Sequence, residues 1–296
     1  MAVYDKSGNR LDQVYGRNGI SLNNAYNKNG DVIFTRYKPN YNNYSEEEYS
    51  TAYVGSSQGF DIYNEIAFQC YGTGKLATID LKNNIVMNTN LSPASGHNNG
   101  ASFSNEFYSN NDIFPLFYIC ADNNIVAHRV TRASVDIHKK YSYTGDNGVK
   151  LGDGGLGFDF ENGVAYTFTY STHSWTSSAD NNMVVITKVD FQNATDNGNG
   201  IYIPIVLAQY EYPFIYCIQS PHFHDGLFWL PSGSGGANQH IYGMNPETGE
   251  IVHTIDIEGT TEIEGVTFIS DFEMVYGMLT GGYRKITFGK ELVASS

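Results

Sequence analysis

The sequence predicts an all-β protein, a five-bladed β-propeller preceded by a short N-terminal β-repeat segment. Three observations lead to this prediction. Aromatic residues make up 14% of the 296 residues, mostly as 23 Tyr and 17 Phe, and only 16% of residues are charged. A short repeat occupies the beginning of the chain, and a longer, looser repeat occupies the remainder. Aromatic and β-branched residues fit the half-buried surface of a pleated strand.

The first 36 residues carry the short repeat. Tyr4, Tyr15 and Tyr26 are eleven residues apart, and glycines and aliphatic residues follow with the same spacing. The units read YDKSGNRL, YGRNGISL and YNKNGDVI. Ser-Gly and Asn-Gly accept the positive φ of tight hairpin turns, so each unit is predicted to be a strand, a turn and a strand. Such units cannot form a core alone, so we expect residues 1–36 to dock onto partners or to oligomerise.

The longer repeat predicts the propeller over residues 58–290, after a polar linker at 37–57. Each unit opens with a short strand beside a glycine or histidine, and further strands separated by turns follow. The openings read GFDIY, GASF, GFDF, PHFH and EGVTF. The fifth unit has only three recognisable strands, so an earlier segment, 51–54 or 31–36, is expected to complete it and close the ring. A β-sandwich or jelly roll is the alternative fold.

Charge and cysteine content exclude several classes of function. The formal net charge of −14 argues against nucleic acid and anionic membranes as partners. No apolar run of 18 residues occurs and no signal peptide is recognisable, which predicts synthesis in the cytosol without membrane insertion. Cys70, Cys120 and Cys217 stand in apolar runs, so we expect buried free thiols rather than a zinc site.

The N-terminal units resemble the Tyr-Asp-x-x-Gly repeats of tail-fibre and receptor-binding proteins from phages and prophages of gut bacteria. The second unit departs from that pattern, with Gly16 where Asp is usual. The stretches QGFDIYN, SFSNEFY, FHDGLFW and TEIEGVTF resemble a propeller domain found after such repeats. The resemblance implies a virion component of the phage tail that attaches to the host, is made in the host cytoplasm and assembles as a homo-oligomer. Other tail proteins are then the expected partners of residues 1–36.

A propeller binds ligands at the mouth of its central channel, where loops lead into the innermost strands. We therefore expect ligand-binding residues at those loops, together with an exposed tryptophan in the long loop at 170–182. The candidates are Gln58, His97, Asn98, Asn99, Asp153, Trp175, Gln219, His222, His224 and Glu262. Tyrosines among amide side chains suit sugar recognition, because a ring packs on the sugar and an amide bonds its hydroxyls.

Two kinds of chemistry remain as alternatives at the same strands. A glycosidase needs two carboxylates about 5–9.5 Å apart, and the candidates are Asp61, Asp159, Glu262 and Glu264. His222 and His224 share one strand face, but no third metal ligand is evident. Glu262 and Glu264 also share a face and are candidates for Ca²⁺. No cofactor or metal is otherwise expected.

The sequence thus predicts a non-enzymatic tail or receptor-binding protein that recognises a bacterial surface glycan or protein. A propeller-type glycoside hydrolase acting on surface polysaccharide is the second interpretation. A structural tail component without a ligand is the third.

Overall fold

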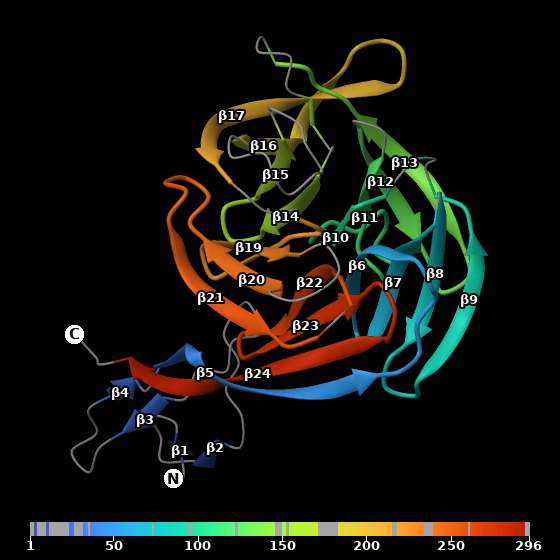
Figure 1. Ribbon diagram of the computed structural model, residues 1–296. Helices are drawn as coiled ribbons and strands as arrows, with labels where there is room; N and C mark the ends of the chain where they lie inside the picture. Colours follow the sequence, from blue (N-terminus) through green and yellow to red (C-terminus); the bar gives the residue numbers. More distant parts are fainter. Residues whose placement is uncertain are drawn as a thin grey trace. The chain divides into compact units, whose positions relative to one another are not determined.

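The computed structural model of the chain describes only β-strands and the turns and loops between them (Figure 1). It describes residues 3–4, 10–11, 24–26, 32–34, 36–72, 74–93, 96, 98–121, 124–145, 150–151, 154–170, 183–214, 218–233, 239–259 and 261–293. In these residues, no helix has the length and apolar character needed to cross a membrane. The chain divides into two compact units, Met1–Ser45 with Thr287–Ser296, and Glu46–Ile286.

The first unit contains two short antiparallel hairpins. Strand β1 (Val3–Tyr4) pairs with β2 (Arg10–Leu11), and β3 (Asn24–Tyr26) pairs with β4 (Val32–Phe34). These hairpins are the first and third repeat units, and they have the strand-turn-strand form that the sequence predicts. The second of the three sequence repeats lies outside the described residues.

Most of the second unit is built from four-stranded antiparallel sheets. One sheet has the order β6-β7-β8-β9, and another has the order β18-β19-β20-β21. Their bounds are β6 (Ser57–Tyr63), β7 (Ile66–Tyr71), β8 (Lys75–Asp80), β9 (Ile85–Leu91), β18 (His222–His224), β19 (Leu227–Ser232), β20 (Gln239–Met244) and β21 (Ile251–Ile257). The first strand of each sheet is its inner strand.

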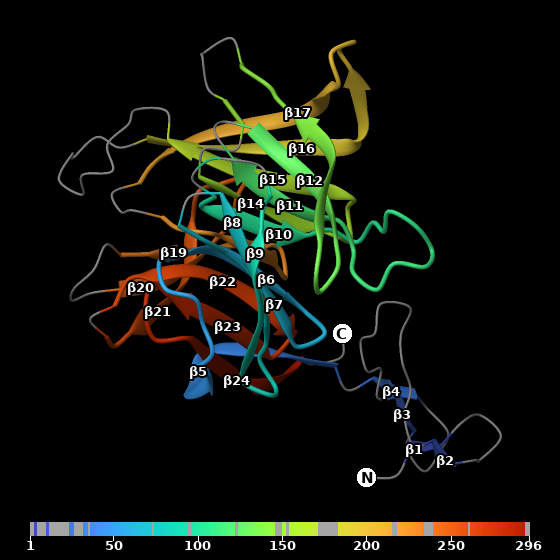
Figure 2. The same ribbon diagram turned by 90° about the vertical axis from the view of Figure 1, so that its right-hand side faces the viewer.

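An eight-stranded sheet joins two further groups of four strands. Its order is β10-β11-β12-β13-β17-β16-β15-β14, and a short parallel pairing of Lys140 with Ile201 and Tyr141 with Tyr202 joins β13 to β17. The bounds are β10 (Gly100–Phe103), β11 (Phe117–Ala121), β12 (Asn124–Val130), β13 (Val135–Tyr141), β14 (Gly155–Asp159), β15 (Val164–Tyr170), β16 (Met183–Asp196) and β17 (Ile201–Pro213). Figure 2 shows β16 and β17 as the longest strands of this sheet.

The last sheet contains strands from both ends of the chain. Its order is β22-β23-β24-β5, with β22 (Ile263–Ser270), β23 (Glu273–Met278), β24 (Tyr283–Val293) and β5 (Arg36–Ser50). An earlier segment therefore does complete this sheet, but it is neither 51–54 nor 31–36. Residues 36–50, most of the predicted linker, form the outer strand. An outermost strand faces solvent, so its polar composition is compatible with a sheet.

The inner strands of these groups contact one another in a circle (Figure 1). Its order is β6, β10, β14, β18 and β22, and β22 contacts β6 again. The glycines that open the strands allow this approach. A Cβ atom on Gly100 would lie 2.4 Å from the Gly155 Cα, and one on Gly157 would lie 2.5 Å from the Phe223 nitrogen. The repeated glycines of the sequence thus mark the places where inner strands touch.

The core lies between adjacent sheets. Phe68 of β7 packs edge to face against Phe103 of β10, with ring centroids 5.2 Å apart, and Phe60 packs in the same way against Tyr283 at 5.1 Å. Aromatic pairs of this geometry add to the stabilisation from burial. Cys70 and Cys120 are buried free thiols, as predicted, and Cys217 lies outside the described residues.

Candidate functional site

The loops before the inner strands bring their backbones together at one end of the circle. The Gly59 amide donates to the Asn98 carbonyl at 3.2 Å, and the Ser220 amide donates to the Glu264 carbonyl at 3.2 Å. A Cβ atom on Gly59 would lie 3.0 Å from both the Asn99 carbonyl oxygen and the Ser220 hydroxyl. Backbone groups therefore fill much of the place where the sequence predicts a channel mouth.

The predicted binding residues at this end differ in their surroundings. Asn98 and Asn99 are 1% and 3% exposed, and among the described residues neither amide atom of Asn98 nor the Asn99 Oδ1 has a hydrogen-bond partner. The Gln219 amide donates to Glu262 Oε1 at 2.6 Å, and the Gln58 amide donates to the Ser57 carbonyl at 3.0 Å. The other predicted contacts here, His97, Asp153 and Trp175, lie outside the described residues.

Asp61 is surrounded by donors. Its carboxylate accepts hydrogen bonds from the Thr267 hydroxyl, from the Phe103 and Ile62 amides at 2.7 Å each, and from the Ser102 hydroxyl at 3.4 Å. Burial raises the pKa of this carboxyl to about 6, although the hydrogen bonds oppose the rise. Because its acceptor sites are occupied by β6, β10 and β22, Asp61 connects inner strands and is not free to act on a substrate.

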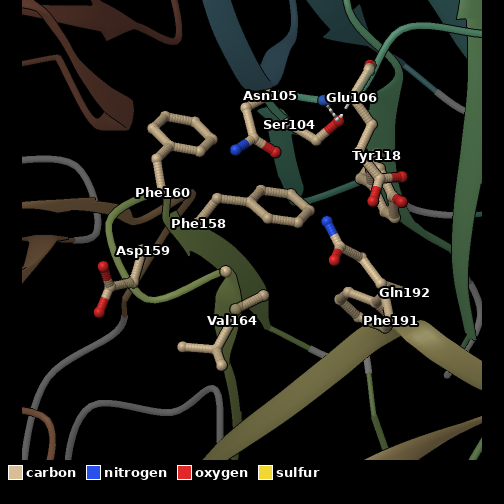
Figure 3. A pocket seen from close by; sticks show the side chains of 12 residues that line it. Ser104, Asn105, Glu106, Tyr118, Phe158, Asp159, Phe160, Val164, Phe191 and Gln192 are labelled. Carbon is tan, nitrogen blue, oxygen red and sulfur yellow. Dashed lines mark hydrogen bonds between the residues drawn. The ribbon is translucent and has the colours of Figure 1, made fainter. Parts of the chain in front are cut away.

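Asp159 holds a turn. Its two oxygens accept hydrogen bonds from the Asn162 amide nitrogen at 3.2 Å and from the Asn162 side chain at 2.7 Å. The same Asp-x-x-Asn arrangement occurs at Asp80 with Asn83 and at Asp190 with Asn193. In Figure 3 the Asp159 carboxylate points away from the Phe158 ring. Its recurrence at the β8–β9 hairpin and at the irregularity inside β16 explains this carboxylate as part of local backbone structure.

Glu264 differs from the other candidate carboxylates. It is buried, and burial first and the charge of Glu262 second raise its pKa to about 9. It is therefore protonated at neutral pH, next to Glu262, which accepts the hydrogen bond from Gln219. A neutral acid beside a second carboxyl group is one requirement of acid catalysis.

The two predicted histidines pack against an aromatic ring. His224 stacks on Phe268 with centroids 4.0 Å apart, and His222 lies 6.1 Å from the same ring. Burial lowers the pKa of each imidazole to about 4, so both are neutral near pH 7. In the part of the chain that is described, no three His, Cys, Asp or Glu side chains are grouped as metal ligands.

A small hollow, partly open to solvent, lies at the opposite ends of the inner strands, between the β10–β13 and β14–β17 groups (Figure 3). Its lining residues are Ser104, Asn105, Glu106, Tyr118, Phe158, Asp159, Phe160, Gly163, Val164, Ala165, Phe191 and Gln192. The sequence prediction names only Asp159 of this set, and its carboxylate serves the turn.

Aromatic rings and polar groups share this hollow. Phe158 and Phe160 are parallel, at an interplanar angle of 3° with centroids 6.1 Å apart, and Phe160 is 47% exposed. In the view of Figure 3 the Asn105 and Gln192 amides lie on either side of the Phe158 ring. Phe158 lies in β14 and Phe160 in the turn after it, and this spacing of two residues is the one sequence signal that indicates a shared surface.

Comparisons with known proteins inform the fold alone. No known protein family matches the sequence, and no curated protein is similar to it. The crystal structure of the glutaminyl cyclase from Myxococcus xanthus is similar at 12% identity and a TM-score of 0.50, over 84% of this chain and 96% of its own. The PQQ-bound aldose sugar dehydrogenase from Streptomyces coelicolor is 9% identical over 85% of this chain and 100% of its own, with a TM-score of 0.49.

These findings define the class of protein as all-β and propeller-like. At 12% identity, the likeness to the cyclase extends to the arrangement of strands and to nothing of its chemistry.

Proposed function

We propose that this protein is a non-enzymatic binding protein that recognises a glycan on a bacterial surface through the hollow between the β10–β13 and β14–β17 groups. The observation that supports this most directly is the combination of Phe158 and Phe160 with the side chains of Asn105, Glu106 and Gln192. These three polar side chains make no hydrogen bond to any described residue. Ring faces pack on the apolar face of a sugar, and free amide and carboxylate groups bond its hydroxyls.

The N-terminal repeats support the proposal of a phage-tail component. Residues 1–36 would bind other tail proteins or copies of this chain, and several linked copies would strengthen weak glycan binding through effective concentration. Deleting residues 1–35 is expected to leave the second unit folded and to reduce oligomer size, measured by light scattering, or incorporation into virions. An unchanged oligomer together with normal incorporation would contradict this part of the proposal.

The proposal includes a five-bladed ring. Counting the eight-stranded sheet as two blades joined by the short β13–β17 pairing gives one blade for each of the inner strands β6, β10, β14, β18 and β22. An experimental structure with a different number of inner strands would overturn the count.

The binding proposal is tested by size-exclusion chromatography of surface polysaccharide with the purified protein. We expect the protein to elute with intact polymer, and Phe158→Ala to abolish this co-elution. Ile113→Ala, which truncates an exposed side chain in the β10–β11 loop, is the control and should behave like the wild type. Failure to bind polysaccharide from any host strain would favour binding of a surface protein or a purely structural role.

A glycoside hydrolase is the second candidate, because Glu264 is a neutral acid beside Glu262. In the same chromatography an enzyme would shift the polymer to smaller sizes, and Glu264→Gln would prevent the shift. Polymer of unchanged length after prolonged incubation would exclude this candidate.

A further inference from the structure

The carboxylate of Glu106 lies in the aromatic hollow without a counter-charge. Glu106 makes no ion pair and no side-chain hydrogen bond with any described residue. Its charge raises the pKa of Tyr118 and Tyr141, so the carboxylate acts on the rings beside it, although burial is the larger cause for both. A half-buried carboxylate among rings loses hydration, and it gains most from a positively charged partner.

Three basic side chains of the surrounding strands, those of Arg129, Lys139 and Lys188, contact other groups. Arg129 of β12 binds Asp112 at 2.6 Å, and Lys188 of β16 binds Glu247 at 2.8 Å. Lys139 of β13 lies over the ring of Tyr202, 5.0 Å from its centroid. These cations are therefore held by other groups, and the charge of Glu106 is left for a ligand.

The rings of the hollow also favour a cation. Tyr118 meets Phe158 edge to face at 4.8 Å, and Phe160 stacks parallel to Phe158. The face of an aromatic ring attracts an ammonium group within about 6 Å of its centroid. The Glu106 carboxylate and the exposed ring of Phe160 in one small hollow therefore favour the same charge.

We propose that the ligand of this hollow is a sugar that carries a free amino group, with its ammonium bound by Glu106. The sugar ring would pack on Phe158, and the Asn105 and Gln192 amides would bond its hydroxyls. This inference rests on the proposed glycan-binding function and adds to it the class of sugar. A neutral or N-acetylated sugar would offer the carboxylate hydroxyl donors but no opposite charge.

The test compares three probes by saturation-transfer NMR and calorimetry: the methyl glycosides of glucosamine, N-acetylglucosamine and glucose. We expect the glucosamine glycoside to bind the full-length protein about tenfold more tightly than the other two, as one charge-assisted hydrogen bond would provide. Glu106→Gln should remove that tenfold advantage, so that the three probes bind with similar affinity.

Gln192→Ala is the matched control, because it removes an amide from the same hollow and is expected to weaken all three probes equally. Unchanged thermal unfolding of both variants would show that they fold. Equal binding of the three probes, insensitive to Glu106→Gln, would overturn the amino-sugar inference and leave the glycan proposal standing. No binding of any probe would overturn both for this hollow.

Discussion

The Asp61 carboxylate accepts a hydrogen bond from the Thr267 hydroxyl and so ties the first inner strand, β6, to the last, β22. The two residues are 206 positions apart in the sequence. The same carboxylate also holds the Phe103 amide of β10, the next inner strand of the circle. One buried acid therefore joins three inner strands.

Replacing Asp61 by alanine would leave the Thr267 hydroxyl and the Phe103 amide without their acceptor. A buried donor that loses its partner costs about 1–3 kcal/mol, so we expect the free energy of unfolding to fall by roughly 3 kcal/mol. Urea denaturation measures the change. Glu48→Ala, which removes an exposed carboxyl from β5, is the control and should cost no more than about 0.5 kcal/mol. Equal losses in the two variants would contradict the role assigned to Asp61.

Glu264 should make the protein less stable as the pH rises. The pKa of this carboxyl is about 9 in the folded protein and 4.5 in the reference state, so the unfolded chain releases the proton first. Between these values each pH unit lowers the free energy of unfolding by up to about 1.4 kcal/mol. Glu264→Gln removes this contribution, so the variant should become progressively more stable than the wild type as the pH rises from about 7 to about 9.

The contribution of the buried histidines to stability has the opposite pH dependence, so it can be measured separately from that of Glu264. The pKa values of His128, His222 and His224 are lowered to about 4 from 6.5, so their contribution to stability is lost as the pH falls from 6.5 towards 4. Above about pH 7 they are neutral in both states, which isolates the effect of Glu264. Thermal unfolding curves that shift in parallel for wild type and Glu264→Gln would disprove the assignment.

Gly157 is expected to tolerate no side chain. Its Cβ would lie 2.5 Å from the Phe223 nitrogen and 3.0 Å from the His222 carbonyl carbon, so Gly157→Ala should separate β14 from β18. Overpacking of this kind costs about 1–3 kcal/mol. Gly55→Ala is the matched control, because a Cβ atom there meets nothing within 4 Å. Similar melting temperatures for the two variants would refute the close approach of the strands.

Two neighbouring glutamates of β5 should differ in their contribution to stability. Glu46 binds the Arg284 guanidinium at 2.8 Å and accepts from the Tyr276 hydroxyl at 2.8 Å, with its side chain only 23% exposed. Glu47 pairs with Lys285 at 2.9 Å but is 63% exposed. We expect Glu46→Ala to cost about 1–2 kcal/mol and Glu47→Ala less than about 0.5 kcal/mol in guanidinium denaturation. The reverse order would contradict the importance of burial here.

The sequence predicts the local parts of this fold well. Asn-Gly and Ser-Gly turns specify hairpins through the backbone conformations they allow, and the opening glycines mark where inner strands meet. It fails for β5, because the polar surface of an outermost strand has the same composition as a linker. It could not show that Asp159 holds a turn, because a turn-forming carboxylate and a catalytic one look alike in sequence.

The hollow could not have been predicted from sequence patterns alone. Glu106 follows β10, Phe158 lies in β14, and Gln192 belongs to β16, so three distant segments must meet before the hollow exists. Only the spacing of Phe158 and Phe160 is local. Of the predicted channel residues that the structure describes, Gln58, Asn98, Asn99, Gln219 and Glu262 lie at or just before the beginnings of inner strands, and close backbone contacts surround them.

The position of β5 beside β24 has a consequence for biosynthesis. During translation β5 leaves the ribosome before every other strand of the second unit, and its partner β24 emerges after all of them. The nascent chain must carry an unpaired strand while the intervening sheets form, and the last sheet assembles only after β24 has been synthesised. Any early chain termination would therefore yield a product with an exposed edge on β5, which is the kind of edge that recruits chaperones or aggregates.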